Sequence, residues 1–229
     1  MGDTVSLQAW MNRATAFELL AHAYLLPTRE LAEALTSGDY AAACDEVAEA
    51  LSFGEDSAIR IRELLATYEG LDAQEVFHEL RHEHTHLFIG EKRPPITPYA
   101  GVWAAEQNGQ QGLLFVGRKT IEIEHFMVRC GVAKDLAAGH TNDPVDHVGT
   151  MCEFAKFLCL VNAEAIQVPQ GAAIEKADFD LFVGECFSGY AKWLAAEVSE
   201  KARTPFFQAA ACLLGAVDAS VASDDADCC

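Results

Sequence analysis

The sequence predicts an all-α fold, a single-domain bundle of about ten helices. Three observations support this prediction. Apolar residues recur at spacings of three and four along most of the chain, which is the period of one helix face. Capping residues, prolines and glycines interrupt that pattern at short intervals and mark where helices begin and end. Valine and isoleucine are scattered rather than alternating in runs, so no convincing strand is predicted.

The first predicted helix, Leu7–Leu26, is the clearest amphipathic segment. Its apolar residues follow the i, i+3, i+4, i+7 pattern, Ser6 can cap its start and Pro27 stops it. Three short helices rich in alanine, leucine and glutamate are predicted next, with glycines between them. They cover Arg29–Thr36, Tyr40–Phe53 and Ser57–Tyr68.

The next helix carries four histidines and leads into a proline-rich segment. Asp72 and Glu75 form a capping box, in which an acidic N-cap is followed three residues later by a glutamate, and the helix that they open runs to about Phe88. Glu91–Gly112 contains three prolines and shows no periodicity, so we expect a long ordered loop, or a loop with a short helical turn. Loops of this length in compact domains often have a function.

A second strong start signal predicts a central helix. In Asp143-Pro144-Val145-Asp146, Asp143 is placed as the N-cap and Pro144 as the first helical residue. This helix is predicted to run to about Ala165, and because it is apolar nearly all round it should lie centrally. The other helices predicted here are Gly117–Cys130, Ile174–Ala202 and a last one from Pro205 to about Val221. We expect residues 1–222 to form the domain and the acidic residues 223–229 to be a disordered tail.

The composition bounds the class of protein. The chain has 229 residues, 51% of them apolar, which fits one globular domain with a sizeable core. A formal net charge of −19 disfavours nucleic acid and anionic membranes as partners and favours a basic partner. The amino terminus has no signal-peptide pattern and no apolar run reaches the roughly 18 residues of a membrane span, so we expect a cytoplasmic protein without stable membrane insertion. The eight cysteines form no C-x-x-C pair, and buried reduced thiols are expected.

The histidine-rich helix contains the pattern His82-Glu83-x-x-His86. It fits the H-E-x-x-H signature of zinc hydrolases, in which the glutamate is the general base. At about 100° per residue, His82 and His86 lie about 40° and 80° from His78, whereas the apolar stripe is centred at about 220°. The members of that stripe are Phe77, Leu80, His84, Leu87 and Phe88. The histidine pair is therefore predicted to face solvent, and because no third ligand completes it, zinc hydrolysis is kept only as an alternative.

A second polar group opens the predicted central helix. By helical spacing, His147 falls on an apolar stripe with Met151 and Phe154, so it is predicted to point inward. It is either a core histidine bonded to a cap or a carboxylate, or a polar group at the floor of a pocket. Asp146 beside it can pair with a cationic partner. The residues alone indicate an acidic, all-α binding domain with an aromatic and proline-rich loop, and they leave the partner open.

Three motifs follow one another along the chain. They are Glu83-His84-x-x-Leu87-Phe88-x-Gly90, Pro94-Pro95-x-x-Pro98-Tyr99 and Asp143-Pro144-x-Asp146-His147-x-Gly149. Together they resemble the TorD/DmsD family of redox-enzyme maturation chaperones, over a range from about Phe17 to Phe207, and they imply a TorD-like fold. The chain departs from the family pattern at three places. His84 stands where the family usually has Tyr or Phe, Asp143 replaces Glu, and Ala100-Gly101 replace the usual small polar residue.

The resemblance implies a cytoplasmic chaperone that is not an enzyme and has no cofactor or metal of its own. Such a chaperone binds the twin-arginine signal peptide and the apo form of a molybdopterin oxidoreductase of the DMSO/TMAO reductase-like kind, and holds the enzyme for cofactor insertion before export. Carboxylates can clamp the arginines, and an apolar groove can take the helical segment of the peptide. The alternative is a nitrate-reductase-type assembly chaperone that acts on the enzyme body. Both a monomer and a homodimer are compatible with the sequence.

We expect the peptide surface to join the Leu87–Trp103 corner to the start of the central helix. Its predicted residues are Glu83, Leu87, Phe88, Pro95, Pro98, Tyr99, Trp103, Asp143, Asp146 and His147.

Overall fold

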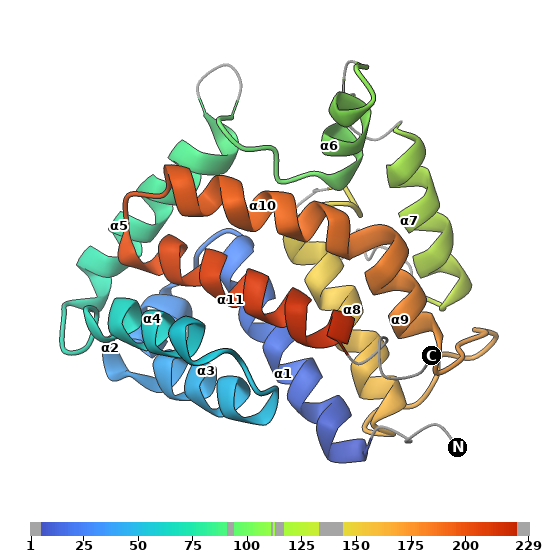
Figure 1. Ribbon diagram of the computed structural model, residues 1–229, viewed down its shortest axis with the longest axis horizontal. Coiled ribbons are helices and arrows are strands. Elements are labelled where there is room, and N and C mark those ends of the chain that lie inside the picture. Colours follow the sequence, from blue (N-terminus) through green and yellow to red (C-terminus); the bar gives the residue numbers. More distant parts are fainter. Residues whose placement is uncertain (1–5, 91–93, 111, 113–116, 133–143, 224–229) are drawn as a thin grey trace.

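The computed structural model describes residues 6–90, 94–110, 112, 117–132 and 144–223. Within these ranges the chain folds into α-helices and two π-helical turns, and its one β-type contact is an isolated bridge between Tyr99 and His147. The helices pack into one body around a shared core (Figure 1). The prediction of an all-α, single-domain bundle of about ten helices is confirmed.

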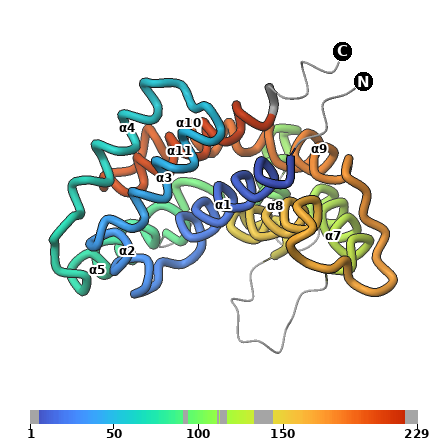
Figure 2. Tube along the Cα trace, turned by 90° about the horizontal axis from the view of Figure 1, so that it is seen from below, coloured from blue at the N-terminus to red at the C-terminus, as the bar shows by residue number. Residues whose placement is uncertain are grey.

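Helix α1 (Leu7–Tyr24) forms the centre of the bundle and packs along α8 (Val148–Asn162), as Figure 2 shows. The Ser6 hydroxyl accepts a hydrogen bond from Ala9 N at 3.1 Å, so the predicted N-cap is confirmed. Gly149 allows the close approach of the two helices, since a Cβ at this position would lie 2.6 Å from the Leu25 side chain.

Two groups of helices cover the centre. Helices α2, α3 and α4 follow one another on one side, and α10 and α11 run side by side across one face (Figure 1). Their bounds are α2 Arg29–Ser37, α3 Asp39–Ala50, α4 Glu55–Ala66, α10 Ser188–Lys201 and α11 Pro205–Ser223. Because α11 contacts α1, α4 and α10, it joins the two groups into one core.

The histidine-rich helix has the predicted start and an unexpected end. Helix α5 (Ala73–His84) begins where the Asp72 carboxylate accepts a hydrogen bond from Glu75 N at 3.0 Å. It then widens into the π-helix η1 (Thr85–Ile89), closed by a 2.8 Å hydrogen bond from Gly90 N to the Thr85 carbonyl. Gly90 has φ 61°, a conformation that favours glycine, and the chain turns away from the helix there.

The proline-rich stretch contains helix α6 (Ala100–Gln107), so the alternative with a short helical segment is the one observed. Helix α7 (Arg118–Arg129) follows close to its predicted bounds. Within the part of the chain that the structure describes, no helix is long and apolar enough to cross a membrane. Six cysteines fall within the described ranges, and all are free thiols, five of them buried.

The predicted start of the central helix is wrong. Helix α8 begins at Val148, with His147 as its N-cap, and Asp143 lies outside the described residues. Pro144 begins a turn that is closed by a 3.1 Å hydrogen bond from His147 N to the Pro144 carbonyl. The local acid-proline signal does not set the start because the Asp146 side chain and carbonyl are bonded to another helix, as described below.

The long helix predicted for Ile174–Ala202 is not regular. It consists of α9 (Asp178–Phe182), the π-helix η2 (Val183–Phe187) and α10. The helix starts four residues late because the Asp178 carboxylate accepts Glu175 N at 2.8 Å and is paired with Arg129 of α7. A local cap and a long-range ion pair therefore decide where this helix begins.

Candidate functional site

The proline-rich segment 94–99 is fixed to three parts of the bundle. In Figure 1 it runs from the end of α5 across α10 to α6. Four hydrogen bonds hold it: Ile96 N to Leu87 O at 3.1 Å, Val148 N to Pro98 O at 2.9 Å, the Tyr190 hydroxyl to Thr97 O at 2.9 Å, and Lys201 Nζ to Pro95 O at 3.5 Å. The loop is therefore an ordered bridge between η1, the start of α8, and α10.

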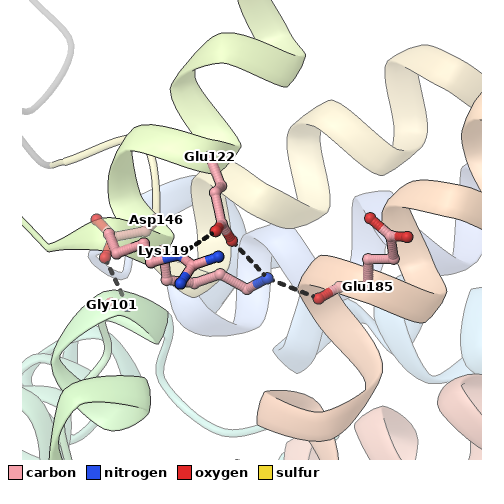
Figure 3. A network of polar contacts seen from close by, with 6 residues as sticks. Gly101, Lys119, Glu122, Asp146 and Glu185 are labelled. Atoms are coloured by element: carbon pink, nitrogen blue, oxygen red, sulfur yellow. Dashed lines mark hydrogen bonds and ion pairs between the residues drawn. The ribbon is translucent and has the colours of Figure 1, made fainter.

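Asp146 ties the start of α8 to α6 and α7. Its carbonyl accepts Ala100 N at 3.0 Å, and its Oδ2 accepts Gly101 N at 2.8 Å and the Thr120 hydroxyl at 3.0 Å. Figure 3 shows the carboxylate directed at the first turn of α6. Backbone N–H groups at a helix start have no partner within the helix, and a negative charge there is favourable, so Asp146 caps α6 from outside.

The Asp146 carboxylate is out of reach of solvent. Its residue is 2% exposed, and Oδ1 has no hydrogen-bond partner among the described residues. Burial raises the pKa of this carboxyl above its ordinary value, and the hydrogen bonds from Gly101 and Thr120 oppose that rise only in part. In this conformation Asp146 cannot receive the arginine of a partner, which is the role that the sequence suggested.

His147 is buried, as its place on the apolar stripe predicted. Its Nδ1 accepts Gly149 N at 3.2 Å, and its ring meets the half-buried Tyr99 ring edge-on, with centroids 5.5 Å apart. Of the two roles that the sequence left open, the capping histidine of the core fits this geometry.

Helix α7 has a second attachment at its first turn. Lys119 Nζ donates to the Glu185 carbonyl of η2 at 2.8 Å and pairs with Glu122 at 3.2 Å (Figure 3). With Thr120 bonded to Asp146, α7 is held between the start of α8 and the π-turn of the α9–α10 helix.

An aromatic cluster lies where α6 meets α10, and we name Trp103, Tyr190 and Trp193 the aromatic ledge. The ring centroids lie 5.6 Å apart for Trp103–Tyr190, 6.3 Å for Trp103–Trp193 and 5.8 Å for Tyr190–Trp193. Tyr190 is buried, and both indoles are partly buried against the core. The exposed Gly189 lies beside Trp103, since a Cβ there would be 3.4 Å from the indole, and its lack of a side chain leaves this edge uncovered.

Several residues predicted for the peptide surface lie in the core. The Glu83 carboxylate is 3% exposed and accepts Arg203 N, just before α11, at 2.6 Å. Leu87 is fully buried, and Phe88 packs edge-on against Tyr24 with ring centroids 6.0 Å apart. These three side chains hold the fold together, which corrects the expectation that they form the wall of an open groove.

The remaining predicted residues divide between core and surface. Pro98 is buried with Asp146 and His147, whereas Pro95 is exposed and Tyr99 and Trp103 are half-exposed. Asp143 lies outside the described residues. The accessible part is therefore Pro95, with partial exposure of Tyr99 and of the two ledge indoles, Trp103 and Trp193.

The zinc-hydrolase pattern is divided between two sides of its helix. His82 is exposed, and with Thr85, His86 and Gly90 it surrounds a shallow hollow of about 440 Å³. Glu83 points into the protein instead, so the general base that this signature requires does not face the histidine pair. Within the described ranges, no group of three or more His, Cys, Asp or Glu is placed to hold a metal ion.

Sequence reasoning missed three parts of this site. Trp193 was visible as one of the aromatic residues on a long late helix, a feature that the family resemblance shares, and nothing in the sequence paired it with Trp103. Thr120 carried no signal, because its bond to Asp146 joins residues 26 positions apart. Gly101 was noticeable only as a departure from the family pattern, and a Cβ there would lie 2.2 Å from the Thr120 hydroxyl and 2.6 Å from Asp146 Oδ2.

Comparison with known proteins agrees with this architecture. A family model described as nitrate reductase delta subunit matches residues 29–191 of the 229-residue chain, a range that includes the proline segment, Asp146 and most of the ledge. No curated protein matched the chain. The match is consistent with the resemblance to TorD/DmsD chaperones. The chain therefore belongs to the nitrate reductase delta subunit family and is a chaperone of molybdoenzyme assembly.

Proposed function

We propose that this assembly chaperone acts in the cytoplasm and binds the twin-arginine signal peptide of a molybdopterin oxidoreductase together with its apo form. The observation that carries the proposal is the aromatic ledge. Trp103 and Trp193 pack partly buried against the core and keep part of their ring surface accessible beside an ordered proline segment. The proposal involves no catalytic step.

The ledge suits the apolar part of a signal peptide. Large aromatic side chains dominate the energetics of protein interfaces because each covers a wide area with few rotatable bonds. Here the two indoles are supported from below by the buried Tyr190 ring, whose hydroxyl is fixed to the Thr97 carbonyl. A helical peptide segment that packs on them buries apolar area without first ordering the receptor, which favours affinity.

The charge of the protein suits the arginine pair. The net charge of −19 speeds the encounter with a basic peptide. Glu185 is exposed on η2, four residues before Gly189, and Figure 3 shows its carboxylate directed away from Lys119. We assign Glu185 as the acceptor of an arginine guanidinium, because a carboxylate binds this group through two parallel hydrogen bonds.

Titration calorimetry with a synthetic twin-arginine signal peptide tests the proposal. Trp103→Ala and Trp193→Ala should each weaken binding about 10- to 100-fold, as expected for central aromatic contacts. Leu71→Ala is the matched control, since Leu71 is a large apolar residue that is 52% exposed and lies away from the ledge, next to Asp72, the N-cap of α5. It should bind like the wild type.

The arginine contact has its own control. Glu185→Gln should weaken peptide binding by about 1.5–3 kcal/mol, the range for a hydrogen bond to a charged group, whereas Glu49→Gln, an equal charge change on α3, should not weaken it. The proposal would be contradicted if the wild-type protein showed no binding to the peptide but still bound apoenzyme that lacks its signal sequence. That result would favour the enzyme body as the only contact.

A further inference from the structure

Helix α6 carries Trp103, and its place depends on few contacts. The helix has eight residues, and only Ala100 and Gly101, its first two, are buried. Helices this short are not stable alone in water, so tertiary contacts must hold this one. The contacts at its first turn therefore decide where Trp103 stands one turn later.

Asp146 supplies most of those contacts. Both buried N–H groups of the first turn, on Ala100 and Gly101, donate to Asp146, one to its carbonyl and one to its carboxylate. The same Oδ2 accepts the Thr120 hydroxyl of α7. The arrangement requires glycine at position 101, because a Cβ there would overlap both Thr120 Oγ1 and Asp146 Oδ2.

We propose that Asp146 is a positioning residue for peptide binding: it fixes the first turn of α6 and thereby holds Trp103 against Tyr190 and Trp193. The inference rests on the proposed function, in which the aromatic ledge contacts the signal peptide. It assigns to Asp146 an indirect role, because the carboxylate is 2% exposed and its bonded oxygen faces the protein. The role of Asp146 is to accept hydrogen bonds at the position of Oδ2. Its negative charge makes no direct interaction with the peptide.

Substitution by asparagine separates the acceptor from the charge. In Asp146→Asn the amide oxygen can take the place of Oδ2 and accept both Gly101 N and the Thr120 hydroxyl, while the amide nitrogen replaces the oxygen that has no partner. Peptide affinity should stay within about threefold of the wild type. Asp146→Ala removes the acceptor and should weaken binding at least tenfold, and Gly101→Ala, which displaces α6 with Asp146 intact, should do the same.

Two further variants distinguish a displacement of α6 from a general loss of stability. Tyr40→Phe removes a buried hydrogen bond to the Leu19 carbonyl in another part of the core, so it lowers stability without moving α6 and should keep wild-type affinity. If Asp146→Ala does not fold, Thr120→Val takes its place, since it removes one bond to Asp146 and keeps the shape of the side chain.

The position of α6 can be measured in the absence of peptide through the fluorescence of Trp103. With Trp10 and Trp193 replaced by phenylalanine, Trp103 is the single indole of the chain, and its quenching by acrylamide reports how far it is covered. Quenching should rise in Asp146→Ala and Gly101→Ala and stay unchanged in Asp146→Asn. This readout tests the positioning role even if the wild type fails to bind the peptide, an outcome that would overturn only the proposed function.

Two results would overturn the inference. If Asp146→Asn lowers peptide affinity as much as Asp146→Ala while Trp103 quenching stays constant, the peptide interacts directly with the charge of the Asp146 carboxylate. If Asp146→Ala changes neither affinity nor quenching, α6 is held by other contacts.

Discussion

Replacing Glu83 by alanine should destabilise the protein without affecting any surface. The buried Glu83 carboxylate accepts Arg203 N at 2.6 Å, across 120 residues of sequence, and so holds the start of α11 against α5. A hydrogen bond to a charged group contributes about 1.5–3 kcal/mol, and the cavity left by the side chain adds to that, so we expect a loss of about 2–4 kcal/mol in the free energy of unfolding. For a chain of this length the melting temperature should fall by roughly 4–16 °C.

Urea denaturation followed by circular dichroism at 222 nm measures this loss. Glu83→Gln keeps an acceptor oxygen and should lose clearly less than the alanine variant. Glu46→Ala, on the exposed side of α3, should stay within about 0.5 kcal/mol of the wild type. If Glu83→Ala is as stable as the wild type but no longer binds the signal peptide, Glu83 acts at a surface, and the structural role assigned to it is wrong.

Two further predictions concern packing and pH. Gly149→Ala should cost about 1–3 kcal/mol of stability in the same urea assay, because the new methyl group meets Leu25 at 2.6 Å, and an unchanged midpoint would show that α1 and α8 are less closely packed. Arg129 lowers the pKa of the Asp178 carboxyl, so this pair stabilises the fold fully above the unfolded-state pKa of about 4, and the contribution is lost as pH falls through the lower folded-state value. The stability difference between the wild type and Asp178→Asn should therefore be larger at pH 7 than at pH 3, and a difference independent of pH would contradict the ion pair.

The parts of the fold that follow local rules were predictable. Ser6 and Asp72 each cap the helix assigned to them, and helical periodicity placed His84 inward and His82 outward. These features depend on residues within one or two turns of each other, so the sequence contains all the information that they need.

The parts that depend on distant contacts were not predictable. Asp146 was placed in the first turn of its own helix, yet it caps α6, because Gly101 and Thr120 are brought to it only by the folded chain. The π-turns η1 and η2 insert a wider turn into helices whose periodicity looked regular. Glu83 was assigned to the surface because its motif is typical of a binding site, and its partner, the Arg203 N–H, has no sequence signature.

The same limit applies to the candidate site. Trp103 was predicted from its place after the prolines, but its neighbours Tyr190 and Trp193 lie 87 and 90 residues later, and pairing them required the packing of α6 on α10. We therefore shift the proposed peptide contact from the Leu87–Trp103 corner and the start of the central helix to the aromatic ledge, which keeps Trp103 and adds Tyr190 and Trp193 of α10.

Photocrosslinking from the signal peptide itself tests the central claim most directly. A twin-arginine peptide with a benzophenone side chain in its apolar segment is irradiated with the wild-type chaperone, and the joined fragments are mapped by mass spectrometry. The account predicts crosslinks within α6 (Ala100–Gln107) and α10 (Ser188–Lys201), suppressed by excess unlabelled peptide. Crosslinks confined to the hollow beside His82 and His86, or to the exposed side of α7, would contradict it.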